Sequence, residues 1–87
     1  MPLTDTVEFL ARLQKLDRIQ VPVEVRWRYK LEPGELLKVK IQLVDSFDHE
    51  EFIVKLPRGG RFTIPWEVVW ALELKKGHML KVLLKPT

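Results

Sequence analysis

The chain has 87 residues and no cysteine, and its formal net charge at pH 7 is +3. This length allows one small domain, because a chain of this size buries only about 60–65% of the surface that it exposes when unfolded. The lack of cysteine excludes disulfides and thiolate zinc sites and favours a reducing, cytoplasmic compartment. No run of about 18 apolar residues is present, and Asp5 and Glu8 lie near the N-terminus, so neither a membrane span nor a secretory signal is expected. The scarcity of asparagine, glutamine and methionine is typical of heat-adapted proteins.

Residues 4–16 form the first predicted element, and their pattern fits two structures. Thr4 and Asp5 could cap a helix that carries apolar residues along one face. The alternation of apolar and polar residues from Val7 to Leu13 is instead typical of a half-buried strand. The segment by itself does not decide between a helix and a strand.

An internal repeat decides this question. Residues 18–39 are matched without a gap by residues 61–82, which lie 43 positions later. In the same alignment residues 50–56 correspond to residues 7–13, and their β-branched and aromatic side chains before Pro57 predict a strand. Because two copies of one unit are expected to fold alike, both segments are predicted to be strands.

A short connection leads to a brief strand in each copy. The second connection contains Gly59 and Gly60, which predict a backbone with positive φ or a close approach to other atoms. The connections are predicted at residues 14–17 and 57–60, and the brief strands at residues 18–21 and 61–64.

Each brief strand ends at a proline, Pro22 or Pro65, which can open a helix because the first helical turn needs no backbone N–H partner. A helix of about two turns then places apolar residues at every fourth position. This spacing predicts that Trp27 and Trp70 face the core. Trp66 replaces a valine of the first copy, so it is the tryptophan expected to be partly exposed.

Each copy closes with a glycine turn and a strand. Residues 32–35 fit a type II turn, with glycine in the left-handed position, and residues 75–78 keep the glycine. Apolar and polar residues then alternate over residues 37–43 and 80–85, which predicts two half-buried strands. Between the copies, residues 45–49 are turn-rich and short enough for a hairpin loop.

The order β-β-α-β, written twice, predicts a single domain over residues 1–87. The first repeat covers about 5–44 and the second about 48–87. Neither copy alone can bury its strand faces, so the two copies must pack against each other. The predicted fold class is all-β with two short helices, in the form of a closed six-stranded barrel with pseudo-two-fold symmetry. Closure of such a barrel removes exposed strand edges.

Two features of the sequence resemble a known group of proteins. Residues 16–26, Leu-Asp-Arg-Ile-Gln-Val-Pro-Val-Glu-Val-Arg, are similar to the AbrB pattern of a loop, an arginine, a short strand and a Pro-x-Glu helix. Gly34-Glu35 and Gly77-His78 resemble the GD box of double-psi and RIFT barrels. Over nearly its whole length the chain therefore resembles the cradle-loop barrels. Within that group it is similar to small stand-alone archaeal RIFT barrels, because two repeats share one chain.

This resemblance implies DNA binding through arginines on and beside the cradle loops. Arg18, Arg26 and Arg61 stand at such positions, whereas Trp27 takes the place of a usual second arginine. Together with Arg58 these arginines are predicted to contact phosphates, which supply affinity without sequence information. The same side chains would also suit an ordinary solvated surface.

Two other functions stay open at this level, a protein-interaction adaptor and a binder of small ligands or nucleotides. Phe47, in the loop between the copies, is a candidate exposed aromatic residue. His49 and His78 stand alone, and Ser46 has no base beside it, so the sequence predicts no catalytic site, metal or cofactor. We therefore predict a monomeric, non-enzymatic protein whose partner is DNA or another protein, without a membrane role.

Overall fold

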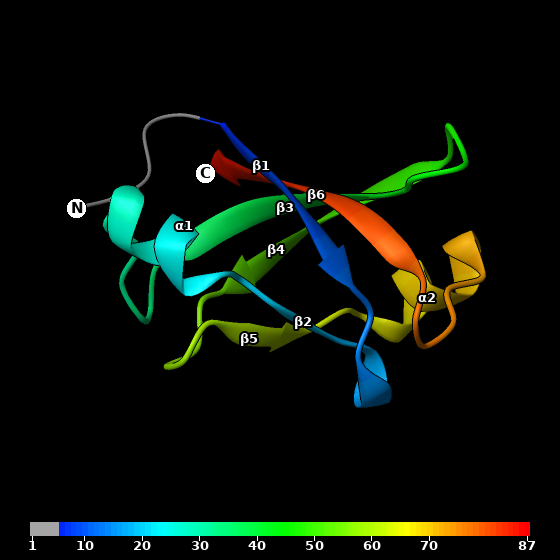
Figure 1. Cartoon of the computed structure of the whole chain (residues 1–87), viewed down its shortest axis with the longest axis horizontal. Helices are drawn as coiled ribbons and strands as arrows, with labels where there is room; N and C mark the ends of the chain where they lie inside the picture. Colours follow the sequence, from blue (N-terminus) through cyan, green and yellow to red (C-terminus); the bar gives the residue numbers. More distant parts are fainter. Residues whose placement is uncertain (1–5) are drawn as a thin grey trace.

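The structure, a computed structural model, describes residues 6–87 (Figure 1). Thr4 and Asp5, the potential helix caps, lie outside the described residues, and the segment after them is a strand, as predicted from the repeat. The order β-β-α-β, written twice, is confirmed. The elements are β1 (Val7–Arg12), η1 (Lys15–Asp17, a single 3-10 turn), β2 (Arg18–Gln20), α1 (Val23–Arg28), β3 (Leu36–Leu43), β4 (His49–Lys55), β5 (Arg61–Thr63), α2 (Trp66–Leu72) and β6 (Met79–Pro86).

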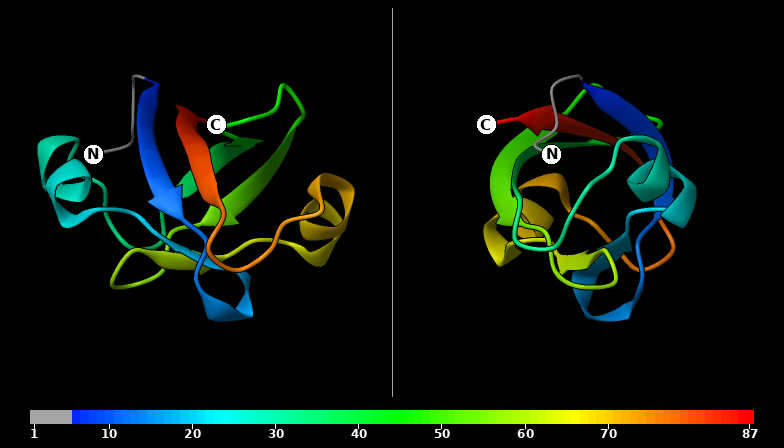
Figure 2. Two further views of the ribbon diagram at one scale, coloured as in Figure 1. Left: turned by 45° about the vertical axis from the view of Figure 1, so that its right-hand side comes forward. Right: turned by 90° about the vertical axis from the view of Figure 1, so that its left-hand side faces the viewer.

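The strands form two separate antiparallel sheets. One has four strands in the order β1-β6-β3-β4, and the other is a two-stranded ribbon of β2 and β5. Within residues 6–87 the edge strands β1 and β4 do not pair with each other or with the ribbon. The predicted closed six-stranded barrel is therefore wrong, and the protein consists of two open sheets facing each other (Figure 2).

The shortness of the ribbon strands explains why closure fails. β2 and β5 contain three residues each, and Pro22 and Pro65 follow shortly after them. A proline has no N–H to donate to a neighbouring strand, so neither ribbon strand can be extended to pair with an edge of the larger sheet. The ribbon lies across the concave side of the four-stranded sheet instead (Figure 2).

The strand register confirms the pseudo-two-fold relation between the repeats. Val7 pairs with Leu84 in β1–β6, and the equivalent residues, Glu50 and Ile41, pair in β4–β3. At the centre of the ribbon, Ile19 pairs with its own equivalent, Phe62. The two-fold axis therefore passes through the ribbon and between β3 and β6.

The glycine turns agree with their prediction. Gly34 has a φ of 91°, and the amide of Glu35 donates to the carbonyl of Glu32 at 3.2 Å, as a type II turn requires. Gly77 has a φ of 94° in the equivalent turn of the second repeat. Each turn leads into the last strand of its repeat, β3 or β6, and these two strands lie in the middle of the four-stranded sheet.

The core lies between the sheet and the ribbon. Val39, Ile41, Val82 and Leu84 project from the central strands, and Phe62 projects from the ribbon toward them. Among the described residues no polar or charged side chain is buried. The interior is therefore filled by apolar side chains that both repeats contribute, which is the shared core that the repeat predicts.

Two of the three tryptophans contradict their predicted positions. The exposed fractions of Trp27, Trp66 and Trp70 are 74%, 72% and 78%, so the prediction that Trp27 and Trp70 face the core is wrong. Trp66 is exposed, as expected of the residue that breaks the repeat. Phe47 is also exposed, in agreement with its prediction. Neither helix in residues 6–87 has the length and apolar content needed to cross a bilayer.

A different stripe of each helix packs on the core. Val68 and Leu72 of α2 are buried, and their equivalents, Val25 of α1 and Tyr29 directly after α1, are partly buried. Both helices are so short that apolar residues occur on more than one side. Spacing by four residues therefore does not identify the buried side, which is known only from how each helix packs on the core.

Candidate nucleic-acid interface

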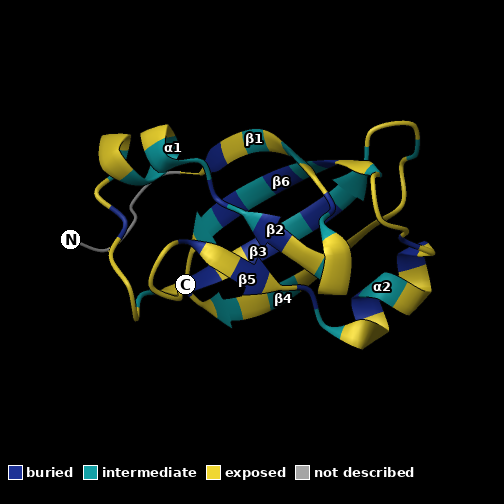
Figure 3. Ribbon diagram, turned by 60° about the horizontal axis from the view of Figure 1, so that its bottom comes forward, coloured by how far each residue is buried: buried dark blue, intermediate teal, exposed yellow. Residues whose placement is uncertain are grey.

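The outer surface of the β2–β5 ribbon brings two of the predicted arginines together. Side chains alternate along a strand, so the buried Ile19 and Phe62 place Arg18 and Arg61 on the outer side. Figure 3 shows buried positions within both ribbon strands, with exposed positions beside them. Both arginines are exposed, and they occupy equivalent positions of the two repeats. They therefore lie on one surface, related by the pseudo-two-fold axis.

The loops that lead into the ribbon add a second equivalent pair of cations. Lys15 of η1 and Arg58 of the loop between β4 and β5 are both exposed and lie 43 positions apart. We call Lys15, Arg18, Arg58 and Arg61 the ribbon face. Asp17 is the acidic residue within these segments, and it is partly buried. Four cations beside one carboxylate create a positive potential that attracts phosphate.

Gln20 holds one arginine of the ribbon face in place. Its side-chain amide donates to the carbonyl of Gly59 at 2.6 Å, and its side-chain oxygen accepts from Nε of Arg61 at 3.3 Å. Gln20 thus ties Arg61 to the loop before β5. Sequence reasoning missed Gln20, because its role depends on the register that places it opposite Arg61.

Arg26, a predicted phosphate ligand, has a different environment. Its Nε donates to the carbonyl of Val21 at 3.3 Å, and the side chain is half-buried. The same side chain covers Gly60, where an added Cβ would lie 2.6 Å from Nε of Arg26. Arg26 therefore packs on the loop beside the ribbon face and helps to position it. Arg18 and Arg58 form no hydrogen bond or salt bridge through their side chains within residues 6–87.

The two loops share one backbone shape. Gly59 and Gly60 have φ values of 89° and 77°, which confirms the positive φ predicted for them, and Arg26 provides the close approach. In the first repeat Leu16 and Asp17 adopt the same left-handed conformation, with φ values of 64° and 56°. Both loops therefore present Lys15 and Arg58 in the same way, although only one loop has glycines.

The histidines do not assemble a metal site. Within the described part of the chain no three histidine, cysteine, aspartate or glutamate side chains lie close enough to hold an ion. Nδ1 of His78 accepts from the amide of Lys75 at 3.1 Å, so this ring completes the turn after α2.

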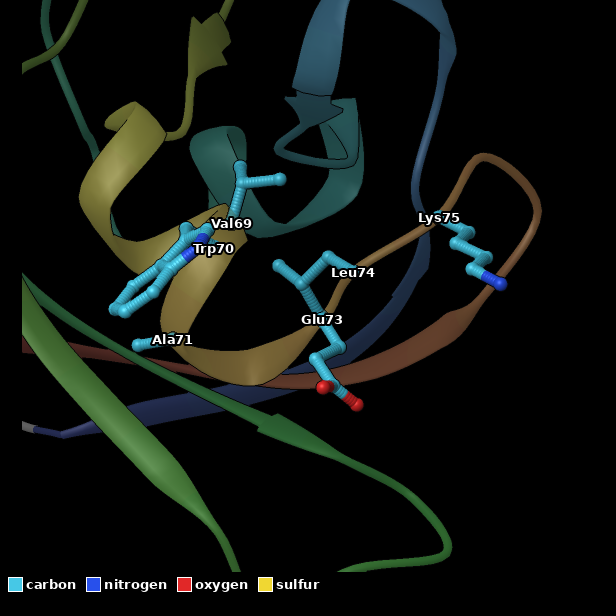
Figure 4. Close-up of a pocket in the computed structure, with 6 residues that line it drawn as sticks. All are labelled: Val69, Trp70, Ala71, Glu73, Leu74 and Lys75. Carbon is cyan, nitrogen blue, oxygen red and sulfur yellow. The ribbon is translucent and has the colours of Figure 1, made fainter.

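A surface hollow of about 690 Å³ lies at the end of α2 (Figure 4). Trp70, Glu73 and Lys75 point in different directions around it. A ligand pocket usually combines an enclosing apolar wall with polar groups that converge on one point. This hollow has the volume of a ligand pocket, but its polar groups do not converge on one point. It is lined by Val69, Trp70, Ala71, Glu73, Leu74 and Lys75.

One solved structure has a similar fold. It is the solution structure of PHS018 from Pyrococcus horikoshii, with a TM-score of 0.80 and 24% sequence identity. The match covers 99% of this chain and 92% of that chain, so the likeness extends over the whole arrangement of the two repeats. At this level of identity it shows the fold alone. A scan against known protein families and a search of curated proteins give no match.

Fold and surface together define a class of protein. It is a small β-rich protein in which two ββαβ repeats enclose one core, with an exposed basic ribbon on the symmetry axis.

Proposed function

We propose that the protein is a non-enzymatic module that binds the phosphate backbone of double-stranded nucleic acid with its ribbon face. The observation that carries this proposal is the two-fold arrangement of Lys15, Arg18, Arg58 and Arg61 around one symmetry axis, with Asp17 as the carboxylate of the same segments. The resemblance of residues 16–26 to AbrB-type domains supports the same use of these side chains.

The symmetry of the ribbon face favours a duplex over a single strand. The two backbones of a duplex are related by two-fold axes perpendicular to its length, and two-fold protein surfaces match that symmetry. Arg18 and Lys15 can therefore approach one backbone in the way that Arg61 and Arg58 approach the other. Contacts of this kind position the protein and carry no sequence information.

The binding constant should depend steeply on salt. Each neutralised phosphate releases condensed counterions, so four contacts give a slope of about −3.6 for log K against log salt concentration. A duplex of about 20 base pairs would be titrated into isotope-labelled protein between 50 and 200 mM salt, and amide shifts of the ribbon face would report its dissociation constant. These amides are expected to shift when duplex is added, and the binding constant derived from them is expected to fall with salt at the stated slope.

A double substitution tests the assignment to the ribbon face. Arg18→Ala combined with Arg61→Ala is expected to weaken duplex binding, so that the dissociation constant read from the ribbon amides rises by about tenfold or more. Arg28→Ala is the control, because Arg28 lies on α1 over the ring of Tyr29, outside the ribbon face. The proposal fails if the ribbon amides do not respond to duplex at 50 mM salt, or if the control weakens binding as much.

A protein-interaction module is the second candidate function. The observation that favours it is the exposure of Trp66 and Trp70 on one helix, because buried tryptophans are frequent anchors of protein interfaces. Replacing both by serine separates the two functions. The ribbon face should still bind duplex with unchanged affinity, since α2 contributes none of its residues. Lost duplex binding in a folded Trp66→Ser/Trp70→Ser variant would instead assign nucleic-acid contacts to α2.

A further inference from the structure

The outer surface of the four-stranded sheet carries a second set of cations. The buried side chains of β3 and β6 alternate with lysines, so these lysines project from the side opposite the core. Lys38 and Lys81 occupy equivalent positions of the two repeats, and both lie on the central strands. We call Lys38, Lys40, Lys81 and Lys85 the lysine face.

The strand register opposes two of these lysines to each other and leaves a third without an acidic partner. Lys38 pairs directly with Lys85 across β3–β6, and like charges in that arrangement destabilise a sheet. Lys81 has Leu10 on one neighbouring strand and Gln42 on the other. Neither member of the equivalent pair Lys38 and Lys81 thus has an acidic residue as a cross-strand partner.

One carboxylate is shared between the two remaining lysines. Glu51 pairs with Lys40 across β3–β4, and it also lies 3.4 Å from Nζ of Lys85. The pair of Lys85 and Glu51 is partly exposed, so it adds little to stability, and Glu51 cancels one of the positive charges. Over all four strands of the sheet, the charged side chains on the outer side are six cations and two carboxylates. The carboxylates are Glu8 and Glu51, and the cations are Arg12, Lys38, Lys40, Lys55, Lys81 and Lys85.

Such a repulsive arrangement indicates a partner that supplies negative charge. Sequences normally agree with the local rules of their fold, and positions that break a rule without local compensation are expected at functional sites. Here the group without full compensation is a set of lysines on the two central strands of the sheet. An extended polyanion complements such a surface.

We propose that the lysine face is a second nucleic-acid surface, so that one molecule bridges two duplexes. This inference rests on the proposed function of the ribbon face. The two surfaces lie on opposite sides of the core, and the molecule measures 34 × 23 × 21 Å (Figure 2). Even its shortest dimension exceeds the screening length of about 10 Å at 0.1 M salt, so two duplexes on opposite sides repel each other weakly.

The test is capture of one duplex by another. A biotinylated duplex fixed to beads, loaded with the protein, is offered a second, fluorescent duplex of about 20 base pairs at 50 mM salt, and the retained fluorescence is measured. The unaltered protein is expected to retain the second duplex. Lys38→Gln combined with Lys81→Gln should lower this retention by about tenfold, while the dissociation constant read from the ribbon amides stays within about twofold.

A matched control removes the same charge elsewhere. Lys75→Gln combined with Lys76→Gln alters two exposed lysines in the turn after α2, outside both faces, and should retain the second duplex fully. Thermal unfolding followed by circular dichroism shows that each variant is folded. Lys38→Gln/Lys81→Gln should melt no lower than the unaltered protein, because it removes the repulsion between Lys38 and Lys85. Lys75→Gln/Lys76→Gln should melt at the same temperature as the unaltered protein, because both lysines are exposed.

The outcomes separate the two proposals. Ribbon amides that respond to duplex, without any capture of a second duplex, overturn the bridging proposal and leave the ribbon face intact as a binding site. Capture that is unchanged in Lys38→Gln/Lys81→Gln, or equally reduced in Lys75→Gln/Lys76→Gln, also overturns it. Ribbon amides that do not respond at all overturn the proposed function, and bridging by two faces falls with it.

Discussion

The two repeats build the same backbone from different residues, and the loops before the ribbon strands show this most clearly. In the second repeat Gly59 and Gly60 take the left-handed conformation, whereas in the first repeat Leu16 and Asp17 take it. Left-handed backbone costs a residue with a side chain roughly 1–2 kcal/mol, and glycine avoids that cost.

Long-range hydrogen bonds impose the shared conformation. The amide of Val21 donates to the carbonyl of Gly60 at 2.9 Å, and the equivalent amide of Ile64 donates to the carbonyl of Asp17 at 2.8 Å. Each loop is thus tied to the ribbon strand of the other repeat. The comparison teaches that the duplicated fold, rather than the local residue type, sets the backbone here, and single substitutions can test that statement.

The centre of the ribbon is where the largest difference between the repeats is expected. Phe62 is buried and its ring lies 6.2 Å from that of Phe52, whereas its equivalent, Ile19, is smaller and equally buried. Phe62→Ala should lower the free energy of unfolding by about 3–5 kcal/mol, and Ile19→Ala by about 2–5 kcal/mol. Urea denaturation measures both values. A smaller loss for Phe62→Ala than for Ile19→Ala would show that the second repeat does not contribute more to the core.

Gly60 provides the next largest effect. Gly60→Ala combines a φ of 77° with a Cβ placed 2.6 Å from Nε of Arg26, and it should cost about 2 kcal/mol of unfolding free energy. Asp17→Ala is the matched change in the first repeat and should cost less, because a side chain is already accommodated there.

A double-mutant cycle separates the two causes at Gly60. Gly60→Ala in an Arg26→Ala background should cost only the backbone part, about 1 kcal/mol, since the crowding side chain is absent. An equal cost with and without Arg26 would contradict the assigned packing of Arg26 on the loop.

Leu16→Gly makes the first loop like the second and should stabilise the protein. Relief of the left-handed strain gains about 1–2 kcal/mol, while the greater freedom of the unfolded chain costs about 0.4–1 kcal/mol. Leu16 is exposed, so little packing is lost. The expected net gain of about 0.5–1 kcal/mol would be measured by urea denaturation. Destabilisation would show that the leucine is not strained.

The smallest effect is expected at the start of α2. Trp66→Val places the residue of the first repeat, Val23, into the second. Because Trp66 is exposed, the free energy of unfolding should change by no more than about 0.5 kcal/mol. A larger loss, measured in the same urea experiment, would show that Trp66 contributes to the fold.

Much of the candidate site could be predicted from the sequence. Arg18, Arg58 and Arg61 were predicted, and the structure places all three on or beside one exposed ribbon. Whether they bind phosphate stays a prediction. Arg26 is assigned to the same group by its place in the AbrB-like pattern of residues 16–26, and only the folded loop shows that its Nε donates to the carbonyl of Val21. Gln20 and the lysine face depend on strand register, which sequence alternation alone does not specify.

The sequence by itself determined the duplication, the order of the strands and helices, and the glycine turns at Gly34 and Gly77. These features follow from local causes, namely the alternation of apolar residues, the fixed φ of proline and the freedom of glycine. The tertiary structure decided that β1 and β4 stay apart as open edges and that Trp27 and Trp70 face outward. Both outcomes depend on how far the three-residue strands extend and on which helix side packs inward, and these are set only when the two repeats pack around their common core.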